Sequence, residues 1–130
     1  MKIEGRAREL IEGKNFATVA TLGKDGQPLL NVVWGDTDGE HVILNSEEGR
    51  TWPENLRRDP RVTVVVPNHD NPYEYVQIRG RVVEDTHDGA REHIDALAKK
   101  YLDKDVYPAH TDSPRIIFRI EAESVRVRGG

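Results

Sequence analysis

Arginine is the residue type in this sequence that is best placed to bind a charged ligand. Arg50 stands directly before a predicted short helix that starts with Thr51, Trp52 and Pro53. A cation beside the positive end of a helix dipole is favourable when an anion is shared by both. The spacing therefore favours an anion site at Arg50. The alternative is that Arg50 is solvated or pairs with a nearby acid, which would be Glu47, Glu48 or Glu54.

A second pair of arginines lies on a predicted strand. Arg79 and Arg81 are two residues apart, so they project from the same face of that strand, together with Tyr75 and Gln77. Such a face can bind an anion, but it can equally be a solvated sheet surface or form ion pairs between subunits.

The sequence lacks the residues of a self-contained catalytic site. It contains no cysteine, and its five histidines are not spaced as a ligand pair on one element. Motifs typical of nucleotide binding or of a serine nucleophile are absent from it. No metal site is expected, and an enzyme of this sequence would take its reactive group from a cofactor.

The elements that must position these residues are mostly strands. Alternating apolar residues, two Asp-Gly turns and β-branched runs predict six strands and a mainly β fold, a closed or partly closed antiparallel barrel. The first three are expected to form a meander. Bulges are expected at Gly80 and within 121–124. The predicted strands are Phe16–Leu22, Pro28–Gly35, His41–Leu44, Val62–Val66, Tyr73–Glu84 and the segment 116–127.

Three helices are predicted to flank the strands, over residues 2–13, 52–58 and 87–101. Thr51 and Glu54 fit a capping box at the start of the second helix. Asp85 or Thr86 is expected to cap the third. Residues 67–72 are expected to form a polar loop.

Composition restricts the function classes. At 130 residues we expect one domain, 1–130, and a net charge of −4 does not favour nucleic-acid binding. No apolar run approaches the roughly 20 residues of a membrane span, and the charged start lacks a signal peptide. The absence of cysteine is compatible with the cytoplasm, where we expect the protein. The low apolar content of 36% suggests an exposed patch that a second subunit covers.

Four segments together resemble the pyridoxamine-5′-phosphate-oxidase-like split β-barrel proteins, and within them the flavin/deazaflavin oxidoreductases of the B group. The resemblance covers nearly all of the chain. The order of a strand with R-G-R-V, a helix and Y-L-D-K-D-V-Y-P is its most specific part. The segments are Phe16–Pro28, Asn45–Val62, Tyr75–Glu84 and Lys99–Pro108 followed by Arg115–Ile120.

The resemblance implies a six-stranded split barrel that forms a homodimer with two cofactor sites at the subunit interface. It also implies coenzyme F-420 (8-hydroxy-5-deazaflavin) as cofactor, with FMN as the alternative. The residues around Arg50 would hold the cofactor phosphate, and the strand with Asn31 and Val33 would pass under the ring. The implied cofactor-binding residues are Asn31, Val33, Arg50, Thr51, Trp52, Asn55, Gln77 and Arg79.

The sequence departs from the resembled pattern at one position. That pattern is usually R-x-K-x-x-N-L, whereas this chain has R-T-W-P-E-N-L, so Trp52 replaces a lysine. Trp52 either packs into the core or lies at the mouth of the cofactor site, and we favour the second because a first helical turn is usually solvent-facing there.

Two functions remain open from the sequence. One is an F-420-dependent oxidoreductase that transfers hydride to or from a small unsaturated or heteroaromatic substrate. The other is a non-catalytic split-barrel module that binds a flavin, haem or deazaflavin. The replacement at Trp52 slightly favours the module, and the wide resemblance elsewhere favours the enzyme.

Overall fold

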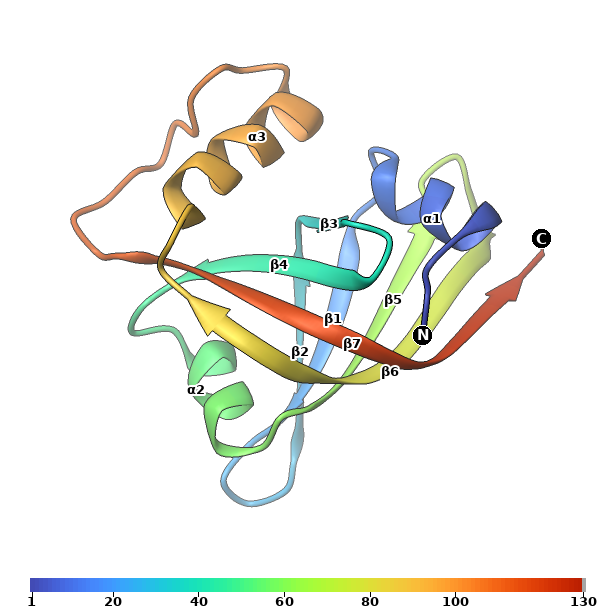
Figure 1. Cartoon of the computed structure of the whole chain (residues 1–130), viewed down its shortest axis with the longest axis horizontal. Coiled ribbons are helices and arrows are strands. Elements are labelled where there is room, and N and C mark those ends of the chain that lie inside the picture. Colours follow the sequence, from blue (N-terminus) through green and yellow to red (C-terminus); the bar gives the residue numbers. More distant parts are fainter. Residues whose placement is uncertain (130) are drawn as a thin grey trace.

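A single antiparallel sheet, strongly curled, organises the chain, with three helices placed around it (Figure 1). The computed structural model describes residues 1–129. The helices are α1 (Gly5–Glu12), α2 (Thr51–Arg58) and α3 (Ala90–Leu102). The strands are β1 (Ala17–Leu22), β2 (Pro28–Val33), β3 (Gly35–Thr37), β4 (His41–Glu47), β5 (Arg61–Asn68), β6 (Asn71–Thr86) and β7 (Arg115–Arg128). None of the described helices is long and apolar enough to cross a membrane.

The curl of the sheet follows from its strand order, β2-β1-β5-β6-β7-β4-β3. Strands β2 and β3 lie at opposite edges, yet in the chain only Trp34 separates them. Consecutive Cα atoms are about 3.8 Å apart, so the two edges must come together at Trp34. The sheet therefore bends round into a split barrel.

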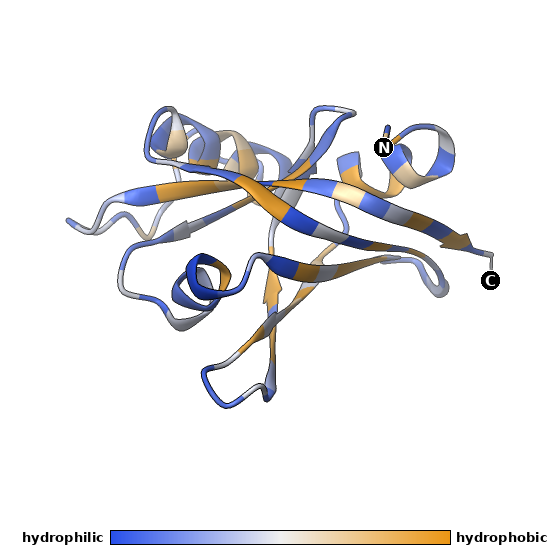
Figure 2. Ribbon diagram, turned by 60° about the horizontal axis from the view of Figure 1, so that its bottom comes forward, coloured by the Kyte–Doolittle hydropathy of each residue, from blue (hydrophilic) through white to orange (hydrophobic). Residues whose placement is uncertain are grey.

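The core fills the inside of this curled sheet. Apolar and polar residues alternate along the long strands, as the banded colours of β6 and β7 show (Figure 2). Because successive side chains on a strand point to opposite faces, this alternation buries one face. Val19, Val64, Ile78 and Phe118 are each at most 1% exposed. Helix α1 covers part of the same core, to which it contributes Leu10 and Ile11.

Helix α3 holds the two sheet edges together where they meet. The Lys100 ammonium group donates to the carbonyls of Ile11 and Gly35, both at 2.7 Å. The Tyr101 hydroxyl donates to the Asn15 carbonyl at 2.6 Å and accepts from the Gly35 N–H at 3.2 Å. The Trp34 and Tyr101 rings stack with their centroids 5.1 Å apart. The junction between β2 and β3 is thus fixed by side chains far away in the sequence.

The prediction of six strands is wrong, because the segment predicted as one strand over Pro28–Gly35 is two. The chain leaves the sheet at Trp34 and re-enters it at the opposite edge as β3. The predicted meander is correct only for β1 and β2, since β4 pairs with β3 and β7 and not with β2. The predicted polar loop at 67–72 is mostly strand, with β5 reaching Asn68 and β6 starting at Asn71.

All three predicted helices exist, but both predicted side-chain caps are wrong. Thr51 is already the first residue of α2, and the capping position falls on Arg50, which makes no side-chain capping bond. Helix α3 begins three residues later than predicted, after Gly89, which has a φ of 73°. Strand β6 extends through Asp85 and Thr86, so neither residue caps the helix.

The predicted turns and bulges are confirmed. Gly26 and Gly39 in the Asp-Gly turns have φ values of 82° and 88°, which glycine adopts without strain. Between β6 and β7 the register passes from the pair Arg79 and Ser124 to the pair Gly80 and Ala122, which leaves Glu123 as the extra residue of a bulge. The two predicted bulges are therefore one irregularity shared by both strands.

Replacing Gly80 with alanine tests this close approach of β6 to β7. A Cβ atom at position 80 would lie 2.1 Å from the Glu121 carbonyl oxygen, so backbone must move to admit it. We expect Gly80→Ala to lower the free energy of unfolding by at least about 2 kcal/mol, as core overpacking does. Denaturant unfolding measures this, with Gly129→Ala as control because nothing lies within 4 Å of its Cβ position. Equal stability of the two variants would contradict the tight contact.

Candidate functional site

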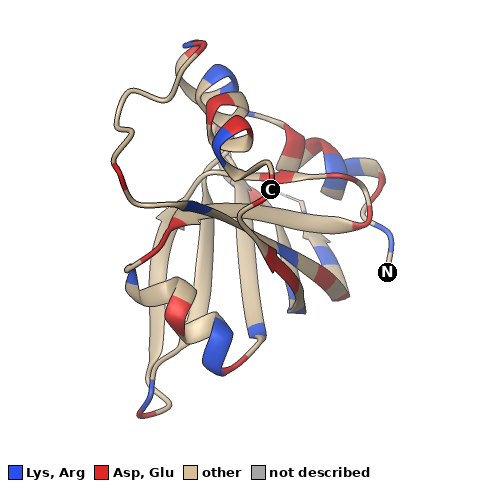
Figure 3. Ribbon diagram, turned by 60° about the vertical axis from the view of Figure 1, so that its left-hand side comes forward, with Lys and Arg blue, Asp and Glu red and all other residues tan. Residues whose placement is uncertain are grey.

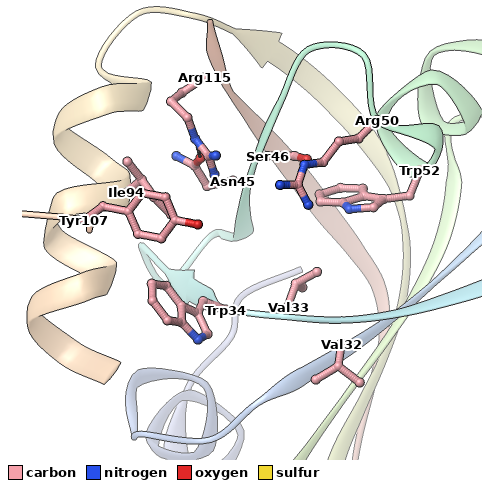
Figure 4. Close-up of a pocket in the computed structure, with 10 residues that line it drawn as sticks. All are labelled: Val32, Val33, Trp34, Asn45, Ser46, Arg50, Trp52, Ile94, Tyr107 and Arg115. Atoms are coloured by element: carbon pink, nitrogen blue, oxygen red, sulfur yellow. Dashed lines mark hydrogen bonds between the residues drawn. The ribbon is translucent and has the colours of Figure 1, made fainter. Parts of the chain in front are cut away.

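Two cavities meet at Arg50, which lines both. The first, which we call the aromatic cavity, has a volume of about 190 Å³. The second, which we call the hairpin cavity, has a volume of about 450 Å³ and lies between the β1–β2 hairpin and the start of α2. The aromatic cavity is bordered by Val32, Val33, Trp34, Asn45, Ser46, Arg50, Trp52, Ile94, Tyr107 and Arg115 (Figure 4).

The aromatic cavity forms where the sheet edges meet. The end of β2 and the residue after it provide Val33 and Trp34, and β4 provides Asn45. Strand β7 runs antiparallel to β4, and the pairing of Glu47 with Arg115 brings the arginine to the same end as Asn45. Figure 4 shows these side chains converging from separate elements, with Tyr107 and Trp34 facing one side of the cavity.

Arg115 is the cation of the aromatic cavity. Its Nε donates to the Asn45 side-chain oxygen at 2.9 Å, and its guanidinium lies over the Tyr107 ring, 5.4 Å from the centroid. The Arg115 side chain is only 8% exposed. Burial lowers the pKa of this guanidinium, because removal from water disfavours the charged form. The charge is therefore less well solvated than that of a surface arginine.

Asn45 orients Arg115 and is itself held from α3. Its side-chain nitrogen donates to the Ala90 carbonyl at 2.8 Å and lies 3.1 Å from Nδ1 of His93. Burial lowers the pKa of His93, so this imidazole is neutral at pH 7 and can accept a hydrogen bond at Nδ1. The direction of the Asn45 amide, and with it the position of Arg115, is fixed by neutral partners.

Arg50 lies between the two cavities and is largely exposed. Its Nη2 and Nε donate to one oxygen of Glu47 at 2.9 and 3.2 Å, which confirms the alternative that Arg50 pairs with a nearby acid. The other oxygen of Glu47 accepts from the Thr111 hydroxyl at 2.8 Å. The Thr111 and Arg50 hydrogen bonds lower the pKa of Glu47.

The hairpin cavity is lined by cations from the hairpin and from both ends of α2. Lys24, Arg50 and Arg58 line it together with Thr51, opposed by two acids, Asp25 and Glu54. Figure 3 shows charged residues at the hairpin tip and along α2. The first N–H groups of a helix have no partners within the helix, and they carry a partial positive charge. The cavity is therefore suited to an anionic group.

Asn55 belongs to the frame of the hairpin cavity. Its side-chain nitrogen donates to the Thr21 hydroxyl at 3.1 Å, and its oxygen accepts from Arg58 at 2.6 Å. Arg58 also donates to the Leu22 carbonyl at 3.0 Å. These bonds attach α2 to β1 and hold the Arg58 guanidinium beside the cavity.

The structure brings most of the predicted site residues together. Val33, Arg50 and Trp52 line the aromatic cavity, and Arg50, Thr51 and Asn55 line the hairpin cavity. Asn31 lies two residues before Val33 on β2, and within residues 1–129 its buried side-chain oxygen has no hydrogen-bond partner.

Gln77 and Arg79 are not brought to either cavity. They line a separate hollow of about 310 Å³ on β6 and β7, together with Tyr75, Arg126 and Arg128. In a single chain they are therefore apart from the other predicted cofactor-binding residues.

Sequence reasoning missed Trp34, Asn45, Ser46, Tyr107 and Arg115 as site residues. Tyr107 and Arg115 lie in segments that carry the family resemblance, but nothing in their spacing gives them a chemical role. They meet only through the pairing of β4 with β7 and through the loop after α3. Asn45 alone could have been noticed, because it directly follows an apolar strand segment. A polar side chain that is buried there needs hydrogen-bond partners, which indicates a polar site nearby.

The expectation that Trp52 is solvent-facing is wrong. The residue is 4% exposed, belongs to the core cluster and packs against Phe118 with the ring centroids 5.7 Å apart. It borders the aromatic cavity while most of its surface is covered by the core. The first turn of α2 therefore points Trp52 inward and leaves Thr51 exposed.

The fold is that of a split β-barrel protein. The family model described as pyridoxamine 5′-phosphate oxidase matches residues 3–129. The chain therefore belongs to the pyridoxamine 5′-phosphate oxidase family. This membership supports a general role in oxidoreduction or flavin binding. No match was found among curated proteins.

Several solved structures are similar over nearly the whole chain. An F420 reductase is 27% identical with a TM-score of 0.82, and the match covers 92% of this chain and 94% of that chain. A conserved hypothetical protein from Mycobacterium tuberculosis is 25% identical with a TM-score of 0.72, covering 98% and 86%. A FAD-binding protein from Mesorhizobium loti is 25% identical with a TM-score of 0.69, covering 95% and 90%.

Replacing Trp52 with lysine distinguishes a core residue from a site residue. The burial of Trp52 against Phe118 predicts that Trp52→Lys lowers the free energy of unfolding by about 3–5 kcal/mol, as the loss of a buried aromatic ring does. Thr51→Lys is a matched control, because Thr51 is exposed in the same helical turn and should change stability by less than about 0.5 kcal/mol. A Trp52→Lys variant that melts like the parent would place the ring outside the core.

Proposed function

We propose that this protein is an oxidoreductase that uses coenzyme F-420, with the cofactor phosphate in the hairpin cavity and the ring directed toward the aromatic cavity. The observation that carries the proposal is the sharing of Arg50 by a cation-lined cavity and an aromatic one. The likeness to an F420 reductase over 92% of the chain supports the choice of cofactor.

The residues present fit such a cofactor. Lys24, Arg50 and Arg58, with the first turn of α2, form a donor set suited to a phosphate diester. The unpartnered oxygen of Asn31 is a buried acceptor on the strand beside the aromatic cavity, and a deazaflavin ring carries an imide N–H that requires an acceptor. The bound cofactor supplies hydride chemistry, for which the protein needs only to position and polarise the reactants.

The side chains of the aromatic cavity have roles other than acid–base catalysis. Trp34, Trp52 and Val33 exclude water and offer flat apolar surface to a planar molecule. Arg115 polarises an oxygen of the substrate. No carboxylate lines the aromatic cavity among residues 1–129, so we expect water to provide the substrate proton.

FMN is the second candidate cofactor. The similar FAD-binding protein favours a flavin. The replacement of a phosphate-binding lysine of the resembled pattern by Trp52 counts against ordinary flavin binding, because it removes one cation. A binding screen of F-420, FMN and FAD with the purified protein decides between them. Tightest binding of F-420, followed by reduction of a conjugated substrate by the reduced cofactor, supports the proposal. Binding of FMN alone, or of a cofactor without any turnover, would replace it.

Arg50→Ala tests the cofactor phosphate position. Loss of a charge-assisted hydrogen bond should weaken F-420 binding by about 1.5–3 kcal/mol, with little change in stability because Arg50 precedes α2 and is exposed. Fluorescence titration measures the affinity. Arg57→Ala is the control, because Arg57 lies on α2, the helix that follows Arg50, but pairs with Glu48 and Glu54 and lines neither cavity. Equal weakening by both variants would indicate a general effect of charge.

We further propose that the protein is a homodimer in which the exposed face of β2 is covered by a second copy. Strand β2 is an edge strand paired only with β1, and its outward residues Leu30 and Val32 are 64% and 70% exposed. An exposed apolar edge strand is normally protected by charges or by pairing. Asn31 and Val33 lie on the same strand, so a second copy that covers this strand would lie beside the proposed ring position.

Val32→Glu tests this interface. A charge at the centre of an apolar contact should shift the protein from dimer to monomer, measured by light scattering at micromolar concentration. Val83→Glu is a matched control, since Val83 is also exposed, at 47%, but lies on β6. The proposal would be contradicted if the parent protein is already a monomer. It would also be contradicted if Val32→Glu forms a dimer as tight as that of the parent.

A further inference from the structure

The aromatic cavity contains more cationic than anionic charge. Arg50 and Arg115 both lie beside Glu47, and no other carboxylate in residues 1–129 makes an ion pair with either arginine. Arg50 and Thr111 hold the two oxygens of Glu47 at 2.8–3.2 Å, whereas Arg115 Nη1 is 3.8 Å from that carboxylate. The one anion is therefore committed mainly to Arg50.

The terminal nitrogens of Arg115 are free to bind a ligand. Its hydrogen bonds within the described residues use Nε alone, which donates to Asn45. Arg115 lines the cavity, and Figure 4 shows its guanidinium directed into the space between Tyr107 and Arg50. A guanidinium that is 8% exposed, and that shares its one carboxylate partner at 3.8 Å with Arg50, is stabilised when a further anion binds to it.

The size and shape of the cavity restrict that anion. A dry apolar cavity of about 150 Å³ accommodates benzene, so about 190 Å³ accommodates one ring with a small substituent. The rings of Trp34 and Tyr107 form two nearly perpendicular walls, with an interplanar angle of 86°. Flat apolar walls beside a fork of parallel N–H donors match a planar molecule that ends in a carboxylate.

We infer that the aromatic cavity is a substrate subsite for a small planar carboxylate, aromatic or conjugated, anchored by Arg115. The hydrogen bond from Nε to Asn45 gives the guanidinium a fixed orientation, and a carboxylate can accept from its two Nη groups as a pair. Asn45 is then a positioning residue that acts through Arg115. The inference rests on the proposed function, because it names the substrate class of that same site.

Direct binding without cofactor tests the inference. Benzoate is titrated into the purified protein, and intrinsic tryptophan fluorescence is followed because Trp34 and Trp52 border the cavity. Benzamide, which has nearly the same shape without the charge, is titrated in parallel. We expect saturable quenching with benzoate at least about tenfold tighter than with benzamide, the factor that one charge-assisted hydrogen bond provides.

Arg115→Met tests whether Arg115 is the cation that binds benzoate. We expect it to weaken benzoate binding at least about tenfold and to leave benzamide binding within about twofold. Arg119→Met is the matched control, because Arg119 lies on the same strand but pairs with Glu84 outside the cavity and should leave both affinities unchanged. Thermal melting shows whether each variant is folded.

Three results would overturn the inference, and the first two need no variant. Equal binding of benzoate and benzamide by the parent protein would remove the anion preference. Displacement of benzoate by saturating oxidised F-420 would assign the cavity to the cofactor ring, and would leave the proposed function standing. If the folded Arg115→Met variant binds benzoate as tightly as the parent, the carboxylate of benzoate does not bind to Arg115. If the parent protein binds benzoate but not F-420, that result would support the carboxylate subsite and contradict the proposed use of F-420.

Discussion

The contact of α3 with the junction between β2 and β3 is the constraint on which the rest of the structure depends. Lys100 and Tyr101 bind both backbone groups of Gly35, so they fix the point where the two sheet edges meet. Burial lowers the pKa of Lys100, which means that its charge is disfavoured by desolvation and must be offset locally. The carboxylates of Asp36 and Glu12 offset part of this cost. The two carbonyls and the Tyr101 ring, 4.8 Å from the ammonium, contribute as well.

The candidate site exists because of this closure. Val33 and Trp34 belong to one edge of the sheet and Asn45 to the strand beside the other edge, so they face each other only when the edges meet. The same helix that closes the sheet also holds Asn45 through the Ala90 carbonyl and His93. Loosening α3 would therefore disturb Arg115 as well as the fold, and the site and the barrel are stabilised by shared contacts.

The sequence predicted what is local and missed what depends on distant contacts. The alternation of β1 and β6, the Asp-Gly turns and the bulge near Gly80 depend on neighbouring residues, and they were predicted. The break at Trp34 was not predicted, because the segment between Pro28 and Gly35 is a mostly apolar run without Gly or Pro. The change of edge depends on Tyr101 and Lys100, which are far away in the sequence. For the same reason Arg50 was recognised from its position before a helix, whereas Arg115 gained a role only through its pairing with β4.

Trp52 shows how a single exchange redistributes charge around the candidate phosphate site. Where the resembled pattern has a lysine, this chain places a ring 4% exposed in the core. A lysine there would need either a partner or a route to solvent, and the packing on Phe118 leaves the position apolar. Under the proposed function, the cations for the phosphate then come from three elements, Lys24 on the hairpin, Arg50 before α2 and Arg58 at its end. Phosphate affinity would depend on how the hairpin sits against α2, and therefore on the Asn55 contact with Thr21.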